Sequence, residues 1–393
     1  MLVYNYHFAT GCNLMNFVLP LLAALLLPVL ALAQTAAMPP APALAAKSYV
    51  LYDFTSNQIL VSQNGLEHLA PAALTKLMTA YLAFNAVRQH QFQLTQQAYP
   101  SLAAIRPQDD EARMFLDHNK AVTVDELLHG LIIQSGDDAA RVLVDLISGG
   151  EAAFTVLMNR QAQELGMMDT HFVNATGQPD PQQYSSAYDL ALLAAAILRD
   201  FPEYYPLYGQ REYQYNNIKL FNNNRLLWND PYVDGIKIGH NENAGYCLVA
   251  SAERNNRRLI SVVLGAASDS LRDSESQKLL NYGFRNFETM PLYQKNQAVG
   301  SLRIWKGAAR TVKVGFPNGL SLTIPKDTLP QFKAMMESHQ PIIAPVGAGQ
   351  KLGVLKLSLD GKPYAEFPLV ALEAIPLSNV FSRGWDSIRL LFQ

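Results

Sequence analysis

The sequence predicts an α/β (α+β) domain, a smaller all-β domain after it and a C-terminal amphipathic helix. Three observations support this fold class. Helical and strand-like periodicities are mixed up to about residue 288, short alternating strands separated by turn residues follow, and apolar residues recur at helical spacing near the C-terminus. The 393 residues are enough for two domains of ordinary size with buried cores.

The chain opens with an apolar segment over residues 16–33, which ends in Ala31-Leu32-Ala33. An apolar core before small residues is typical of a signal peptide, predicted here to cover residues 1–33, although about 18 apolar residues can also cross a bilayer as a retained helix. Prolines inside the segment and the Ala/Pro-rich spacer after it favour cleavage. Residues 1–33 contain no Lys or Arg, so Met15 is an alternative start.

The first domain is predicted over residues 34–288 and begins with a hairpin. Residues 49–54 predict a strand and residues 59–61 its partner, because turn residues separate two β-rich runs. Pro71 then precedes a helix predicted over residues 72–88, in which apolar side chains share one face.

Two further helices are predicted in this domain. Thr123 and Glu126 form a capping-box pattern that opens a helix through Ile133. A polar break over residues 134–138 separates it from a helix predicted over residues 139–147.

Two β runs, residues 244–252 and 257–265, flank a turn predicted over residues 253–256. Cys247 lies in the first run and is predicted to be a core residue. The only other cysteine, Cys12, would be removed with the leader, so the exported protein is expected to have no internal disulfide.

The second domain is predicted over residues 289–375 as an all-β domain without catalytic residues. Apolar residues alternate with polar ones in three short runs, with turn residues between or after them. The runs contain Val312/Val314/Phe316, Leu320/Leu322/Ile324 and Leu355/Leu357/Leu359.

The last segment, residues 376–393, predicts an amphipathic helix. Its apolar residues at helical spacing are Leu377, Phe381, Trp385, Ile388 and Leu391/Phe392. Such a helix can lie in a membrane interface, with its aromatic side chains among the headgroups. The alternative is a helix packed on its own domain.

Composition excludes several functional classes. Hydrophobic residues make up 49% and charged residues 16%, which is a globular balance without a disorder signature. The net charge of −2 gives no reason to expect a nucleic-acid partner. The eight histidines show no metal-ligand spacing, so no metal and no cofactor are predicted.

Three short segments are candidates for chemistry when they are read together. A residue at the start of a helix and a lysine three positions later lie on one face, within hydrogen-bond reach. This arrangement suits a nucleophile with an adjacent base, and the helix dipole favours the developing anion. The segments are Pro71-Ala72-Ala73-Leu74-Thr75-Lys76-Leu77-Met78-Thr79, Ser135-Gly136-Asp137 and Asp234-Gly235-Ile236-Lys237-Ile238-Gly239-His240.

The segments resemble the Ser-x-x-Lys, Ser-x-Asn and Lys-Thr-Gly motifs of penicillin-binding proteins and serine β-lactamases. Their order and spacing are similar to those of the D-alanyl-D-alanine carboxypeptidases, which are low-molecular-mass penicillin-binding proteins. The resemblance extends over nearly the whole exported chain, including residues 184–189, 224–228 and 244–252. It implies a transpeptidase/β-lactamase-like first domain, a β-domain and a C-terminal membrane-anchor helix.

The resemblance also implies roles for individual residues. The catalytic positions are those of Ala73, Lys76 and Ser135. The substrate-binding positions are those of Asp137, Lys237, Gly239 and Arg272. Lys237 and Arg272 are candidates for a cationic site that receives an anion, or for a surface charge pair left from ancestry.

Each of the three segments departs from its motif. Ala73 stands where the family has its nucleophilic serine, Asp137 where it has asparagine and Ile238 where it has threonine. Alanine has no atom that can attack a carbonyl carbon. An ionised aspartate only accepts hydrogen bonds, and beside Lys76 it favours the ammonium form, which is the wrong state for a general base. Ile238 replaces a hydroxyl that in the family helps to hold the substrate carboxylate.

The sequence therefore predicts a catalytically inactive carboxypeptidase homologue of peptidoglycan metabolism. It is expected to be periplasmic, attached to the outer face of the inner membrane by its C-terminal helix, and to bind stem peptides or a wall-synthesis protein. An active or residually active serine-type carboxypeptidase that trims pentapeptides is one alternative. A non-enzymatic scaffold at the membrane surface is another.

Overall fold

The computed structural model describes residues 39–108, 111–326 and 332–390. The predicted signal peptide over residues 1–33 lies outside this part of the chain, as do Leu391 and Phe392 of the C-terminal segment. The described chain forms two compact units, one ending at Phe287 and the other starting at Glu288, each with its own hydrophobic core.

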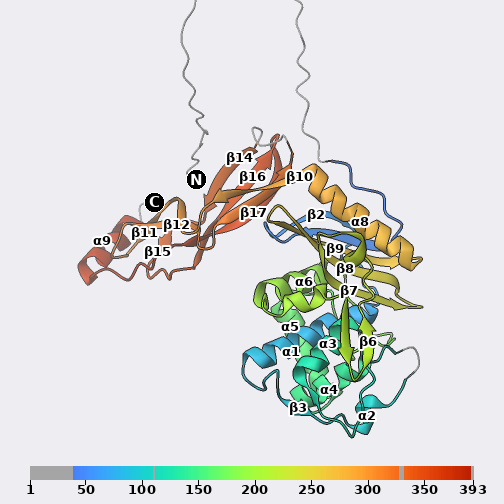
Figure 1. Cartoon of the computed structure of the whole chain (residues 1–393). Helices are drawn as coiled ribbons and strands as arrows, with labels where there is room; N and C mark the ends of the chain where they lie inside the picture. Colours follow the sequence, from blue (N-terminus) through green and yellow to red (C-terminus); the bar gives the residue numbers. More distant parts are fainter. Residues whose placement is uncertain (1–38, 109–110, 327–331, 391–393) are drawn as a thin grey trace, which may run out of the picture. The chain divides into compact units, whose positions relative to one another are not determined.

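The first unit is built on a five-stranded antiparallel sheet with strand order β2-β1-β9-β8-β7 (Figure 1). An N-terminal hairpin thus pairs with strands from far along the chain, and β7 lies at an edge of the sheet. The strands are β1 (Ser48–Asp53), β2 (Gln58–Gln63), β7 (Val233–Asn241), β8 (Gly245–Arg254) and β9 (Arg257–Ala266).

Both predicted hairpins of this sheet are confirmed. The turn between β8 and β9 is tighter than predicted, because only Asn255 and Asn256 separate the strands. Their φ angles of 52° and 61° are those of a two-residue hairpin turn, a conformation that asparagine tolerates well. Cys247 is fully buried in β8, as predicted.

Helices cover both faces of the sheet. Helix α8 (Asp269–Asn286) packs against β8 and β9 on one face, while α6 (Ala187–Asp200) packs against β1 and β9 on the other (Figure 1). The remaining elements of the unit are η1 (Ala72–Thr75), α1 (Lys76–Arg88), β3 (Gln97–Ala98), α2 (Leu102–Ile105), β4 (Val122–Thr123), α3 (Val124–Ile133), α4 (Asp137–Ser148), α5 (Glu151–Glu164), η2 (Tyr205–Gly209), β5 (Glu212–Tyr215), β6 (Ile218–Phe221) and α7 (Leu226–Asn229).

The capping box that opens α3 is confirmed: the Thr123 hydroxyl accepts from the Glu126 amide, and the Glu126 carboxylate accepts from the Thr123 amide. Two predicted boundaries were wrong. The helix predicted from residue 72 begins with the 3-10 turn η1. Helix α4 begins at Asp137 rather than at residue 139, since Gly136 serves as its N-cap and acidic side chains are favoured in a first helical turn.

The second unit is β-rich, as predicted. Its larger sheet has strand order β14-β16-β17-β12-β11-β15, and β10 pairs with β13. The three predicted apolar runs lie in β12, β13 and β16 and supply residues to the core. The strands are β10 (Phe287–Tyr293), β11 (Gln297–Trp305), β12 (Thr311–Phe316), β13 (Leu320–Pro325), β14 (Phe332–Ser338), β15 (Ile342–Ile343), β16 (Lys351–Leu359) and β17 (Lys362–Ala371).

The predicted C-terminal helix is present as α9 (Val380–Leu390), which contains no buried residue. Its apolar side chains are exposed to solvent: Phe381 is 90% exposed and Trp385 59%. The alternative of a helix packed on its own domain is therefore contradicted only for these exposed apolar side chains, because other residues of α9 are half-buried.

No single helix within the described residues is long and apolar enough to cross a membrane. The consecutive helices α4 and α5 meet the criteria of length and composition together, with a bend of 85° between them. Both helices also supply buried residues, such as Leu143 and Phe154, to the core of the first unit.

Candidate active site

Ala73, at the predicted nucleophile position, lies half-buried in η1 directly before α1. The preceding Ala72 has a φ of 47°, a left-handed conformation that costs a residue with a Cβ roughly 1–2 kcal/mol. The backbone of Gly177 lies against this turn, so close that a Cβ there would be 1.9 Å from the carbonyl oxygen of Ala72. The surroundings thus hold the turn in a strained conformation, as is common at functional sites.

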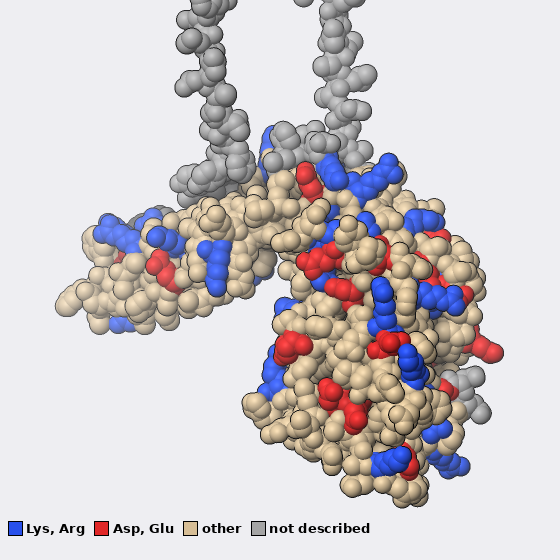
Figure 2. Space-filling model, viewed as in Figure 1, with Lys and Arg blue, Asp and Glu red and all other residues tan. Residues whose placement is uncertain are grey.

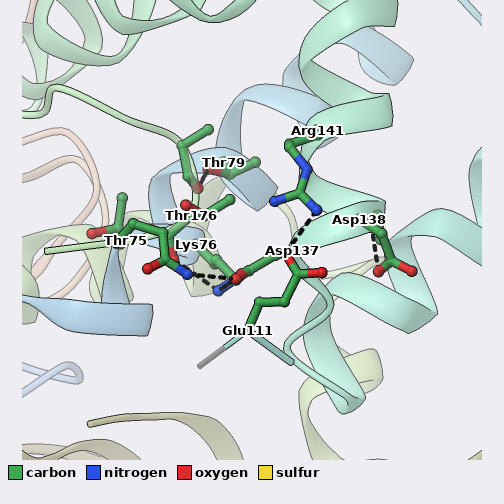
Figure 3. A network of polar contacts seen from close by, with 12 residues as sticks. Thr75, Lys76, Thr79, Glu111, Asp137, Asp138, Arg141 and Thr176 are labelled. Carbon is green, nitrogen blue, oxygen red and sulfur yellow. Dashed lines mark hydrogen bonds and ion pairs between the residues drawn. The ribbon is translucent and has the colours of Figure 1, made fainter. Parts of the chain in front are cut away.

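Lys76, the first residue of α1, is buried and ion-paired with Asp137 at the start of α4 (Figure 3). The Lys76 Nζ lies 2.5 Å from Oδ1 of Asp137, and both side chains are only 3% exposed. The same Nζ donates a 2.7 Å hydrogen bond to the carbonyl oxygen of Thr176. Gln178 donates to Oδ2 of Asp137 at 3.0 Å. Both carboxylate oxygens of Asp137 are therefore engaged.

Ser135 lies in the connection between α3 and α4, two residues before Asp137. Its φ of 63° is left-handed, like that of Ala72. Its Oγ is shielded from solvent and has no hydrogen-bond partner among the described residues. A shielded hydroxyl without a partner in the described chain is available to a ligand atom.

Lys237 projects from β7 and is 4% exposed. Its Nζ donates a long, 3.5 Å hydrogen bond to the carbonyl oxygen of Ile132. Burial and, to a smaller extent, the charge of Lys76 lower the pKa of Lys237, while Asp137 partly offsets them, so that the net pKa is about 7. Lys237 thus belongs to the same electrostatic cluster as the Lys76–Asp137 pair.

Gly239 is required by the close approach of β7 to η1. A Cβ at this position would lie 3.1 Å from the carbonyl oxygen of Pro71 and 3.1 Å from Cγ of Leu74. This approach brings the third predicted segment against the first.

Two predicted site residues lie on the other face of the sheet. Ile238 pairs across the ladder with Leu248 and packs with the core on the α8 side, whereas Lys237 pairs with Val249 on the opposite face. Arg272, on α8, is 3% exposed and forms an ion pair with Asp273 at 2.7 Å. The structure therefore gives Lys237 and Arg272 different partners, and neither is a surface charge.

Comparison with known proteins identifies the family. A family model described as D-alanyl-D-alanine carboxypeptidase matches residues 33–268, and one described as the C-terminal domain of penicillin-binding protein 5 matches residues 287–377. The chain belongs to the D-alanyl-D-alanine carboxypeptidase family. It combines the transpeptidase domain of that family with the β-rich domain and C-terminal helix that follow it.

Relatives match over most of their length. The D-alanyl-D-alanine carboxypeptidase DacC of Escherichia coli (strain K12) is 38% identical over 358 residues, 90% of each chain. DacA of Haemophilus influenzae is 39% identical over 349 residues, covering 88% of this chain and 89% of the relative. The crystal structure of penicillin-binding protein 5 from H. influenzae superposes with a TM-score of 0.80 at 38% identity, covering 86% of this chain and 99% of that one.

Sequence reasoning missed several residues that build this carboxypeptidase-like site. Thr176 and Gln178 lie in a loop without periodicity, and only the fold brings them to Lys76 and Asp137. The Asp138 carboxylate, also overlooked, accepts from the backbone amides of Met114 and Leu116 and fixes the loop that leads to α3. Nothing in the sequence relates these distant segments.

A second overlooked pair lies beside Asp138 (Figure 3). Glu111, whose side chain is 2% exposed, pairs with Arg141 of α4 at 2.8 Å. The adjacent Ala112 accepts a 2.7 Å hydrogen bond from the Asp137 amide. The loop before α3 therefore helps to hold Asp137 at the start of α4.

The chemistry that the site offers is limited. The Ala73 methyl cannot attack, the Lys76 amine is occupied by a carboxylate and a carbonyl, and the Ser135 hydroxyl is unpaired within the described chain. Over the same described ranges no group of three or more His, Cys, Asp or Glu side chains is arranged to hold a metal ion.

Proposed function

We propose that this carboxypeptidase homologue binds peptidoglycan stem peptides or a wall-synthesis protein without cleaving them. The observation that carries the proposal is the Lys76–Asp137 ion pair beside Ala73. Without a hydroxyl at residue 73 no acyl-enzyme forms there. An ammonium group paired with a carboxylate has no lone pair with which to accept a proton, so the general base is lost as well.

The main alternative is a carboxypeptidase in which water replaces the serine. Hydrolases that lack their nucleophile retain roughly 10³–10⁴ of acceleration over water from the rest of the site. Such a water needs a base, and Asp137 is the carboxylate in contact with Lys76. Its two oxygens already bind Lys76 and Gln178, which argues against this role.

The edge strand β7 supports a binding function. An extended peptide can add to a free sheet edge through main-chain hydrogen bonds, and this requires no nucleophile. Lys237 lies on this strand, and the Ser135 hydroxyl has no hydrogen-bond partner in the part of the chain that the structure describes. Arg272 would first have to leave Asp273 before it could bind a substrate carboxylate.

Calorimetry with a synthetic stem pentapeptide tests this function. We expect the wild-type protein to bind, and the double variant Lys237→Ala/Arg272→Ala to bind at least about tenfold more weakly, because charge-assisted contacts are lost. Lys219→Ala, which removes an exposed lysine on β6, is the matched control. Equal binding by the double variant would instead favour the scaffold alternative, in which the cleft is inert.

We further propose that the protein is periplasmic and attached to the outer face of the inner membrane through α9. The predicted signal peptide supports export. The exposure of Phe381 and Trp385 supports attachment, because large apolar side chains seldom face water without a binding role when they form a patch.

A further inference from the structure

Helix α9 is bonded to its own β-domain at several points. The Asp386 carboxylate accepts a 2.7 Å hydrogen bond from the amide of Lys306, which follows β11 and has a φ of 60°. The Lys306 carbonyl accepts from the Ser378 amide at 2.9 Å, and the Pro376 carbonyl accepts from the Ala308 amide at 2.8 Å. The helix and the chain leading into it therefore both contact one turn.

The face of α9 that meets the domain is mostly polar and includes one apolar residue, Leu390. Arg383, Asp386, Ser387 and Leu390 are half-buried, whereas Val380, Phe381, Trp385 and Ile388 are 51–90% exposed. At about 100° per residue, Asp386 lies about 160° round the helix from Ile388. An ordinary surface helix buries its apolar stripe and exposes its polar face. Helix α9 does the reverse.

A basic side chain lies beside the exposed apolar face. The Arg389 guanidinium is 5.6 Å from the centre of the Trp385 ring. Figure 2 shows Lys and Arg side chains gathered over the end of the β-domain that carries α9. An apolar face flanked by basic groups matches the chemistry of a bilayer containing anionic lipids.

We propose that Asp386 is a positioning residue that latches α9 to the β-domain by its polar face and so presents the apolar face outward as a preformed membrane-docking surface. This inference rests on the proposed membrane attachment and specifies how it is achieved. Because α9 is already held on the β-domain, it does not have to fold or reorient when it docks on the membrane. Less conformational entropy is therefore lost on docking than with a flexible tail.

The latch is tested on the full exported chain with two measurements. Hydrogen exchange reports whether the amides of α9 and of Lys306 are protected in the absence of lipid. Sedimentation with phosphatidylethanolamine/phosphatidylglycerol vesicles reports affinity. Asp386→Ala removes the acceptor of the Lys306 amide, whereas Asp386→Asn keeps an acceptor oxygen. Ser382→Ala is the control at an exposed position. The double variant Phe381→Ser/Trp385→Ser removes the apolar side chains proposed to bind the membrane.

Asp386→Ala is expected to lose protection of the Lys306 amide and to bind vesicles about fivefold to tenfold more weakly. Asp386→Asn and Ser382→Ala should behave like the wild-type protein. The latch is wrong if Asp386→Ala keeps both protection and affinity while the double variant loses binding. Unchanged vesicle binding by the double variant would instead refute membrane attachment through α9. In that case hydrogen exchange of the Lys306 amide would still show whether Asp386 holds α9 on the domain.

Discussion

In the proposed function, Ala73 and Asp137 each prevent catalysis in a different way. The first removes the attacking atom, and the second engages the amine that would activate one, at a distance of 2.5 Å. Restoring a hydroxyl alone leaves Lys76 paired. The proposal therefore predicts that catalysis requires two substitutions, one at each position.

We expect Ala73→Ser to label with a fluorescent penicillin at least about 10²-fold more slowly than Ala73→Ser/Asp137→Asn, because a general base contributes 10²–10⁴ to such a step. Asparagine can hydrogen-bond Lys76 through its oxygen without a charge. Asp137→Asn alone, the control, should remain unlabelled. Equal labelling rates for the single and double variants would show that Asp137 is not a second defect.

Lys237 predicts a pH dependence of stability. Because its pKa in the folded protein is lowered to about 7 from its usual 10.5, the unfolded chain binds the proton more tightly. The buried charge therefore destabilises the protein fully below about pH 7, and this cost falls as pH rises towards 10.5, by at most about 1.4 kcal/mol per pH unit.

Lys237→Met should accordingly stabilise the protein more at pH 6 than at pH 9, since it removes a buried charge that is mostly neutral at the higher pH. Urea denaturation of both proteins at the two pH values measures the difference. Lys219→Met, at an exposed site, should show none. If Lys237→Met changed the free energy of unfolding by the same amount at both pH values, the lowered pKa of Lys237 would be contradicted.

At the scale of elements, the loop that carries Thr176 and Gln178 packs against η1 through Gly177 and so holds the Lys76–Asp137 pair in place. This glycine has a φ of 90° and no room for a Cβ against Ala72. Gly166 has a similar φ of 79° but open space around it, so it isolates the cost of backbone strain.

Gly166→Ala is expected to lower the free energy of unfolding by about 1–2 kcal/mol, from strain alone. Gly177→Ala adds a clash with backbone and should cost more than about 3 kcal/mol. Thermal or urea unfolding of the two variants and the wild-type protein measures both losses in the free energy of unfolding. Similar costs for the two variants would mean that the loop can move away from η1, and that it does not lock the site.

The elements themselves were largely predictable from local patterns. Alternating apolar residues predicted the hairpins, and Thr123 with Glu126 predicted the start of α3. The start of α4 was predicted two residues too late. Its first two residues, Asp137 and Asp138, are aspartates, a residue type that is common both in loops and in first helical turns. The 3-10 geometry of η1 depends on tertiary contacts with Gly177 and Gly239, which no local pattern encodes.

The sequence predicted which residue types are at the site but not which hydrogen-bond partners hold them in place. The segments around Lys76, Asp137 and Lys237 meet as the resemblance implied. Thr176 and Gln178, which hold the ion pair, lie 100 and 41 residues away in sequence from the groups that they bind. The packing of Ile238 on the α8 side depended on which face of the sheet this residue occupies.

At the scale of the molecule, the chain joins a transpeptidase domain to a β-rich domain and a C-terminal helix with an exposed apolar face. The proposed export, membrane attachment and ligand binding do not need a hydroxyl at residue 73, because none of them uses it. The proposed protein is therefore a binding member of a family of peptidases.

Intact mass spectrometry of the purified exported form tests this account most directly. The protein is incubated with a β-lactam and, separately, with a stem pentapeptide. We predict an unchanged protein mass with the β-lactam and no release of D-alanine from the peptide. A covalent adduct, or released D-alanine, would contradict the account and show that another nucleophile or a water has replaced the serine.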